Sequence, residues 1–219
     1  MSLEKVVEVA KSQVGITEYP PDSNHVLYNA EYYGQDVSGD AYPWCVTFLW
    51  WIFKTANEQK AFFGGAKTAS CTILMQWYVE QTQTVPVSEI QPGDILILNF
   101  KGTKSPQHCG YVIETNGSYY TTIEGNTTNG SGSQDNGGMV CEKRRYPYQV
   151  VKVCRPKYSK DEPKSDYETH WAKNTINNLL EKKIISGYPD GTIRPNNPIT
   201  RAEAFTLVEK AINYILDSR

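Results

Sequence analysis

The chain has 219 residues, a formal net charge of −2, 39% hydrophobic residues and 21% charged residues, which are ordinary values for a globular protein. The weak net charge and the absence of a long basic run in the sequence exclude the usual footprint of a nucleic-acid-binding protein. The densest basic cluster, Lys143–Arg145, is predicted to be a solvated strand edge. The length suits one or two domains, and a segment of about 150 residues is long enough to bury its own core.

The first segment has apolar residues at helical spacing. They recur over residues 6–14 and Gly15 follows, which predicts a helix that stops near this glycine. Glu4 and Glu8 lie inside the same stretch, which therefore resembles an amphipathic helix more than a signal peptide. The longest apolar run, Cys45–Phe53, is too short to span a bilayer. We therefore expect synthesis in the cytoplasm without a signal peptide, no membrane insertion, and release by another route.

The next segment changes character at Pro43. Tyr19–Asp22 predicts a turn, and the polar, tyrosine-rich residues 24–40 predict a loop. Residues 44–53 are apolar on nearly every face, which predicts a buried helix with Pro43 just before it or in its first turn. A further helix is predicted around Thr72–Gln81.

A run of strands follows these helices. They are predicted at Asp94–Leu98, Gly110–Glu114, Tyr119–Glu124, Val140–Arg145 and Val150–Cys154. Asn116-Gly117 is a hairpin signal, and residues 127–138, rich in Gly, Asn and Ser, predict a mobile loop. Helices followed by strands indicate an α+β domain with an antiparallel sheet.

The tail of the chain is predicted to be a separate helical segment. Residues 157–165 lie in a charged, proline-containing stretch, which predicts a linker between a domain at 1–156 and a small module at 166–219. Helices are predicted at Trp171–Lys183 and Arg201–Leu216, with a turn at residues 187–191. A module of about fifty residues is close to the lower size limit for folding alone.

The cysteines are the first candidates for chemistry. There are five, Cys45, Cys71, Cys109, Cys141 and Cys154. The number is odd and no CxxC pair occurs, so neither a disulfide framework nor a thiolate zinc site is expected. Cys45 lies where the helix after Pro43 begins, and a helix N-terminus favours a thiolate. Backbone N–H groups of that first turn would also stabilise a tetrahedral oxyanion.

One histidine is placed to assist this cysteine. His108 opens a predicted strand behind the turn-like residues 102–107. The residue that orients an imidazole in such a site is Asn, Asp or Glu. Glu124 and Asn126 end the next strand, so a hairpin brings one of them beside His108.

Each cysteine also has a plainer interpretation, because a buried cysteine is usually a small apolar residue. Cys71 is predicted to pack in a helix. Strand alternation points Cys109 away from His108, toward the opposite face of the sheet. Cys141 and Cys154 lie in late strands and are predicted to be structural.

Four segments in this order resemble the CHAP family, the cysteine, histidine-dependent amidohydrolases/peptidases. They are YPWCVTFLWW at 42–51, QPGDI at 91–95, HCGYVIE at 108–114 and IEGNT at 123–127. The resemblance covers roughly residues 1–156 and implies a papain-like fold. It also implies that Cys45 is the nucleophile and His108 the general base and acid. Glu124 would orient His108, and Asn126 would be a polar partner.

The same resemblance implies a substrate and raises one cofactor question. The family implies acyl transfer to Cys45 from an amide of peptidoglycan, either N-acetylmuramoyl-L-alanine or a peptide bond of the stem or cross-bridge. Some members bind calcium before the nucleophile, where this chain has Asp36 and Asp40. Their spacing matches no full calcium loop, so no cofactor is expected, with calcium as the alternative.

The tail closely resembles the S-layer homology (SLH) motif, on HWA at 170–172, ISGYPDGTIRPN at 185–196 and ITRAEA at 199–204. This implies an all-α module that binds secondary cell-wall polysaccharide, with Trp171, Arg201 and Glu203 as contact residues and Arg201 as the anion contact. Thr200 and Glu203 also form a capping box, which is the plainer interpretation of both. The family usually has three copies and this sequence has one. Either the module binds weakly alone or three chains associate as a homotrimer.

These features together predict an endolysin-like peptidoglycan hydrolase of a phage or prophage, which acts at a Gram-positive-type cell wall. A host autolysin is the nearest alternative. A non-catalytic wall-anchoring protein is disfavoured by the complete set of Cys45, His108 and Glu124. A cysteine protease or transpeptidase acting on proteins is disfavoured by the SLH-like tail.

Overall fold

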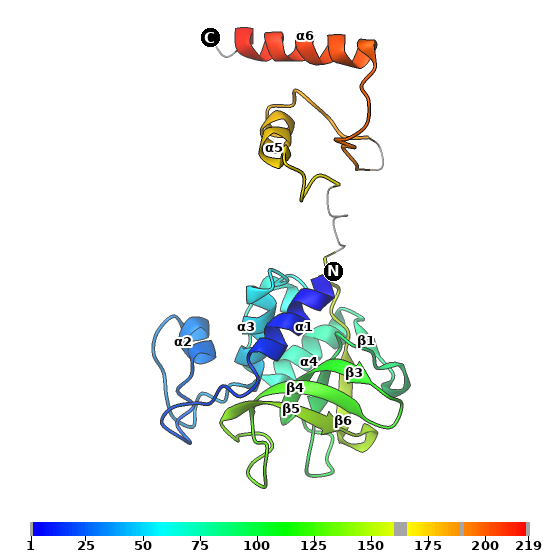
Figure 1. The fold of residues 1–219 in the computed structure, drawn as a ribbon. Coiled ribbons are helices and arrows are strands. Elements are labelled where there is room, and N and C mark those ends of the chain that lie inside the picture. Colours follow the sequence, from blue (N-terminus) through cyan, green and yellow to red (C-terminus); the bar gives the residue numbers. More distant parts are fainter. Residues whose placement is uncertain (1, 160–165, 189–190, 218–219) are drawn as a thin grey trace. The chain divides into compact units, whose positions relative to one another are not determined.

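The chain folds into two compact units, Met1–Ser159 and Lys160–Arg219. The structure is a computed structural model that describes residues 2–159, 166–188 and 191–217 (Figure 1). None of the described helices combines the length and the hydropathy needed to cross a membrane.

The first unit is an α+β fold, as predicted. Its helices are α1 (Ser2–Ser12), α2 (Leu27–Tyr33), α3 (Cys45–Thr55) and α4 (Cys71–Glu80). Its strands are β1 (Thr84–Val85), β2 (Ile95–Leu98), β3 (His108–Thr115), β4 (Tyr120–Thr127), β5 (Met139–Arg145) and β6 (Val150–Cys154). All neighbouring strands pair antiparallel, in the order β1-β6-β2-β3-β4-β5.

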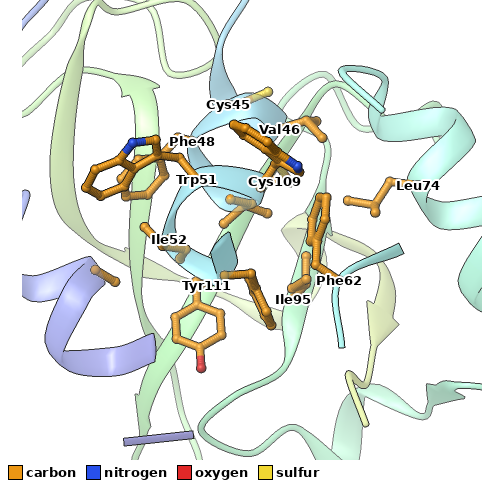
Figure 2. Packing of buried hydrophobic residues seen from close by; sticks show 14 of the residues in the cluster. Cys45, Val46, Phe48, Trp51, Ile52, Phe62, Leu74, Ile95, Cys109 and Tyr111 are labelled. Carbon is orange, nitrogen blue, oxygen red and sulfur yellow. The ribbon is translucent and has the colours of Figure 1, made fainter. Parts of the chain in front are cut away.

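The core lies between α3 and the sheet. Every residue of Cys45–Phe53 is buried, as the all-round apolar pattern predicts, and α3 packs against β3 and β4. Figure 1 shows α1, α3 and α4 gathered over the sheet, and Figure 2 shows the packed side chains, with Cys45 at the start of α3. Ile95 and Ile97 of β2 join this core, while Leu96 and Leu98 join a second cluster. Since strand residues alternate in direction, the sheet is covered by apolar side chains on both faces.

One helix was not predicted. The stretch 24–40, expected to be a loop, contains α2, and Tyr28 of this helix is fully buried against Trp44, Phe48 and Trp51. A helix of 7 residues is too short for a clear periodic signal, so its tertiary contacts decide the conformation.

The first unit extends past Pro156. Tyr158 Oη donates to the carbonyl of Gly93 at 2.6 Å, and Ser159 N donates to Glu58 Oε2 at 2.9 Å. Most of the predicted linker, residues 160–165, lies outside the described residues.

The second unit holds α5 (Lys173–Glu181) and α6 (Arg201–Asp217), both close to the predicted bounds. The Asp166 carboxylate accepts hydrogen bonds from the backbone of Ile193 and Arg194 at 2.8 and 2.5 Å. His170 Nε2 lies 3.1 Å from Asn196 Oδ1. These contacts join the residues before α5 to the residues before α6. The predicted turn at residues 187–191 includes residues 189 and 190, which lie outside the described residues.

Candidate active site

Cys45 lies at the N-terminus of a buried helix. It is the first residue of α3, Trp44 is the residue before the helix, and Cys45 is 5% exposed. The indole Nε1 of Trp44 donates to Glu18 Oε2 at 2.9 Å, which fixes the entry into the helix. The helix dipole therefore favours a negatively charged sulfur at this position.

His108 and Glu124 form a buried pair. His108 Nε2 lies 3.0 Å from Glu124 Oε2, and both side chains are fully buried. His108 Nδ1 is also buried and has no hydrogen-bond partner among the described residues. The imidazole and the Cys45 thiol nevertheless lie close enough for each to shift the pKa of the other. Since Nε2 is occupied by Glu124, Nδ1 is the nitrogen left for the thiol.

Glu124 is held by groups that the sequence did not reveal. Arg145, 3% exposed, donates from Nε to Glu124 Oε1 at 2.8 Å and from its terminal nitrogen to Oε2. Thr122 Oγ1 donates to Glu124 Oε1 at 2.5 Å. The prediction of a solvated edge at Lys143–Arg145 is thus wrong for Arg145, because β5 pairs with β4 and turns this guanidinium toward Glu124.

A glycine leaves room for the Glu124 carboxylate. A Cβ atom at Gly110 would lie 2.7 Å from Glu124 Cγ and 2.9 Å from Oε1. These distances are far below van der Waals contact, so only glycine at this position of β3 lets Glu124 cross to His108 unobstructed.

Electrostatics favour an ion pair between the sulfur and the imidazole. The thiols of Cys109 and Cys71 and the imidazole of His108 stabilise the Cys45 thiolate and hold its pKa well below the usual range. Burial alone lowers the pKa of His108, but its interactions with Cys45 and Glu124 outweigh this and raise the pKa to about 9. Burial raises the pKa of Glu124, whereas hydrogen bonds from Arg145 and His108 more than compensate and lower it to about 2.

Asn126 makes its side-chain contacts in the loop before β5. Its amide donates to Asn136 Oδ1 at 3.0 Å, and its Oδ1 accepts from Gly138 N at 3.3 Å. Its backbone is left-handed, with φ of 58°, at an irregularity of the β4–β5 pairing. The described contacts of its side chain lie in the loop before β5 and do not include His108.

Two further cysteines lie beside Cys45. Cys71 is the first residue of α4, where Ser70 Oγ accepts from Ile73 N as the N-cap, and its sulfur is 3.8 Å from that of Cys45. Cys109 is fully buried in the core cluster on the α3 side of the sheet. The three sulfur atoms lie within 4.8 Å of one another. The Ser70-Cys71 pair was the available signal for a second cysteine at a helix N-terminus.

The residues predicted to contact the cell wall lie on the second unit. Trp171 is 91% exposed, with its ring 5.4 Å from that of His170. Arg201 is exposed and lies over the Phe205 ring at 5.8 Å. Glu203 Oε2 accepts from Thr200 N and Oγ1 at 2.8 and 2.7 Å, and these bonds lower the pKa of Glu203. The predicted capping box is therefore present.

A groove of about 730 Å³ lies on the same unit. Its lining includes Tyr188, Arg194, Glu203 and Lys210. Trp171 and Arg201 are not part of this lining, so the structure brings only Glu203 of the three predicted contact residues to the groove.

A helix that carries a cysteine at its N-terminus, packed on an antiparallel sheet that carries a His–Glu pair, is the arrangement of the papain-like cysteine hydrolases. Comparison with known families agrees. Residues 37–126 match the CHAP domain, and residues 165–205 match the S-layer homology domain. The chain thus carries a CHAP domain followed by an SLH domain. A CHAP domain indicates a cysteine- and histidine-dependent amidohydrolase or peptidase, and an SLH domain indicates association with the cell wall.

Curated relatives support the SLH part. The chain is 37% identical over 63 residues to cell surface glycoprotein 1 of Acetivibrio thermocellus. This stretch covers 29% of this chain and 2% of that protein. It is 45% identical over 47 residues to the cellulosome-anchoring protein of the same organism, covering 22% and 10%. It is 44% identical over 48 residues to S-layer protein EA1 of Bacillus anthracis, covering 22% and 6%. The chain therefore spans no more than 10% of the length of these relatives. No solved structure matches the chain.

Proposed function

We propose that this chain is an endolysin-like peptidoglycan hydrolase that cleaves an amide bond of the bacterial cell wall through a covalent intermediate on Cys45. The observation that carries the proposal is the geometry of His108, whose Nε2 is held by Glu124 while the buried Nδ1 has no partner among the described residues. A nitrogen in this state, beside a cysteine at a helix N-terminus, is suited to exchange a proton with that cysteine.

In the first step, the Cys45 thiolate attacks the carbonyl carbon of the substrate amide. The oxyanion that forms is stabilised by backbone N–H groups at the start of α3, which precede the first helical hydrogen bond, from Phe48 N to Trp44 O. The imidazolium of His108 then donates its proton to the departing amine, and a thioester remains on Cys45.

In the second step, water hydrolyses this thioester. His108, now neutral, removes a proton from water, and the hydroxide attacks the acyl carbon to release a carboxylic acid and regenerate the Cys45 thiolate. Glu124 holds the imidazole in one orientation through both steps and stabilises its charged form, as Arg145 holds Glu124. Arg145 is thus a positioning residue in this proposal.

The cleaved bond is either N-acetylmuramoyl-L-alanine or a peptide bond of the stem or cross-bridge. The second unit directs the enzyme to its substrate by binding secondary cell-wall polysaccharide. Exposed Trp171 offers an aromatic face to sugar rings, and exposed Arg201 offers a cation to acidic groups. Glu203 acts mainly by capping α6.

The second unit also supports self-association. Helix α6 exposes apolar residues at helical spacing, Phe205, Val208, Ile212 and Ile215, which together form a stripe on one side of the helix. Three chains that pack these stripes together would form a homotrimer with three SLH motifs. Sedimentation at micromolar concentration tests this, and a monomer would contradict it.

The function is tested by digestion of purified Gram-positive peptidoglycan, with mass spectrometry of the released fragments. Release of stem peptides or shorter cross-linked pieces is expected, and the fragment masses identify the cleaved bond. If walls from several species are bound but release nothing, the wall-anchoring alternative replaces the hydrolase.

A further inference from the structure

The three sulfur atoms at the start of α3 have the spacing of ligands around one metal ion. Zinc–sulfur bonds are about 2.3 Å long, so two thiolates of a tetrahedral zinc site lie about 3.8 Å apart. The sulfurs of Cys45 and Cys71 are 3.8 Å apart, and Cys109 completes a triangle with no side longer than 4.8 Å. This is the one such cluster of potential metal-ligating side chains among the described residues.

The three sulfurs can hold a zinc ion without a fourth protein ligand. Zinc sites with three protein ligands keep the fourth position open for water or another small ligand. His108 is not part of the cluster, so the fourth position of the ion would be taken by water.

The two other cysteines of the chain show what a structural cysteine looks like in this fold. Cys141 and Cys154 are buried in β5 and β6 and lie outside the triangle. Cys45 and Cys71 are instead the first residues of two helices, so the positive ends of two helix dipoles meet at their sulfurs.

We propose that the sulfurs of Cys45, Cys71 and Cys109 bind Zn²⁺, and that this binding reversibly blocks the hydrolase. Each thiol that is still protonated releases its proton to solvent when it binds the ion. The sulfur lone pair of Cys45 is then engaged by the metal and unavailable to the substrate. The metal site stands independently of the proposed function, whereas the inhibition rests on it.

The cysteine spacing led us to expect no thiolate zinc site. Zinc ligands usually occur in closely spaced pairs, whereas Cys45 and Cys71 are 26 residues apart. They meet only because two helices and one strand begin at the same place in the fold.

Metal binding is tested directly with Cd²⁺, whose bonds to thiolates absorb in the ultraviolet, and by competition with Zn²⁺. The wild type should bind one ion per chain. Cys71→Ser should bind at least about tenfold more weakly, since the loss of even an indirect partner of a metal ligand costs 10–100-fold. Cys141→Ser is the matched control and should bind like the wild type. Equal affinity in Cys71→Ser would overturn the site. Cys109 is fully buried, so Cys109→Ser is informative only where its thermal unfolding matches that of the control.

Inhibition is a second, separate measurement. Each variant's hydrolysis with Zn²⁺ is divided by its own rate without Zn²⁺, so that differences in basal rate cancel. The wild type should lose activity and regain it with a chelator, and Cys71→Ser should resist. Ion binding without any hydrolysis would support the site and refute the proposed function. If free thiols are lost and only a reductant restores them, while a chelator does not, a Cys45–Cys71 disulfide has formed. That result would overturn the proposal.

Discussion

Replacing Arg145 by methionine removes the buried counterion of Glu124 at nearly constant volume. Loss of one partner from a buried ion pair costs roughly 3–5 kcal/mol. The pKa of Glu124 gives a similar figure. It falls from 4.5 to about 2, the net result of burial, which raises it, and of the stronger opposing effects of Arg145 and His108. A difference of about 2.5 corresponds to roughly 3 kcal/mol of stability.

The pH dependence of this effect has a defined sign. Because the folded-state pKa of Glu124 is below the unfolded value, its contribution to stability is complete above about pH 4.5 and is lost as the pH falls toward about 2. Arg145→Met loses the part of this contribution that Arg145 supplies already at neutral pH. A loss of about 3 kcal/mol should lower Tm by roughly 6–12 °C, and the gap to the wild type should narrow in acid.

The assay is thermal unfolding followed by circular dichroism, from neutral pH down to about pH 3. Arg144→Met is the matched control, because Arg144 is the neighbouring residue, is exposed and lies over the Tyr119 ring at 4.8 Å. Its effect should stay within about 0.5 kcal/mol. A Tm for Arg145→Met equal to that of the control, or a difference in Tm from the wild type that does not change in acid, would show that Arg145 does not stabilise the charged form of Glu124.

Three further predictions concern the site and the tail. Gly110→Ala should push the Glu124 carboxylate away from its position and lower kcat/KM on soluble peptidoglycan fragments by about 10²-fold. Hydrolysis should require the Cys45 thiolate together with the His108 imidazolium. The rate should therefore fall at alkaline pH near the His108 pKa of about 9, which burial lowers and the stronger effects of Cys45 and Glu124 raise. Thr200→Ala should destabilise the second unit by about 1 kcal/mol, because α6 loses its cap, measured by thermal loss of its helical signal.

Control variants and specific outcomes test the three predictions on Gly110, His108 and Thr200. Gly130→Ala adds a methyl group into open space and should keep the full rate. Full activity of Gly110→Ala would show that the position of Glu124 does not matter for hydrolysis. If the rate of hydrolysis instead falls near the ordinary histidine pKa, the ion pair between Cys45 and His108 is contradicted. Thr200→Ser retains the hydroxyl and should melt like the wild type, and equal melting of Thr200→Ala would contradict the cap.

The sequence revealed features that depend on local patterns. Residues 44–53 are apolar all round, which predicted both α3 and its burial, and Pro43 located its start next to Cys45. Strand propensity and turn signals located five of the strands, while the two-residue β1 carries too little pattern to detect. The Thr200 hydroxyl and the Glu203 carboxylate form a capping box within one helical turn. Their spacing in the sequence therefore predicted their contact.

Features that depend on register and on distant contacts were missed. Arg145 lies in a basic triplet typical of solvent exposure, and only the pairing of β4 with β5 brings it to Glu124. Asn126 is two residues beyond Glu124, but the irregularity in the same pairing gives it a different direction. Cys71 joins Cys45 through the packing of α4, which no spacing in the sequence encodes.

The central claim is that the Cys45 thiolate cleaves peptidoglycan. It is tested most directly by the rate of fragment release from Gram-positive cell walls by the wild type, by Cys45→Ala and by Cys141→Ala, which removes a buried thiol outside the site. The wild type and Cys141→Ala should release fragments, whereas Cys45→Ala, although folded and bound to the wall, should release none. Release by Cys45→Ala at the rate of the wild type would contradict it.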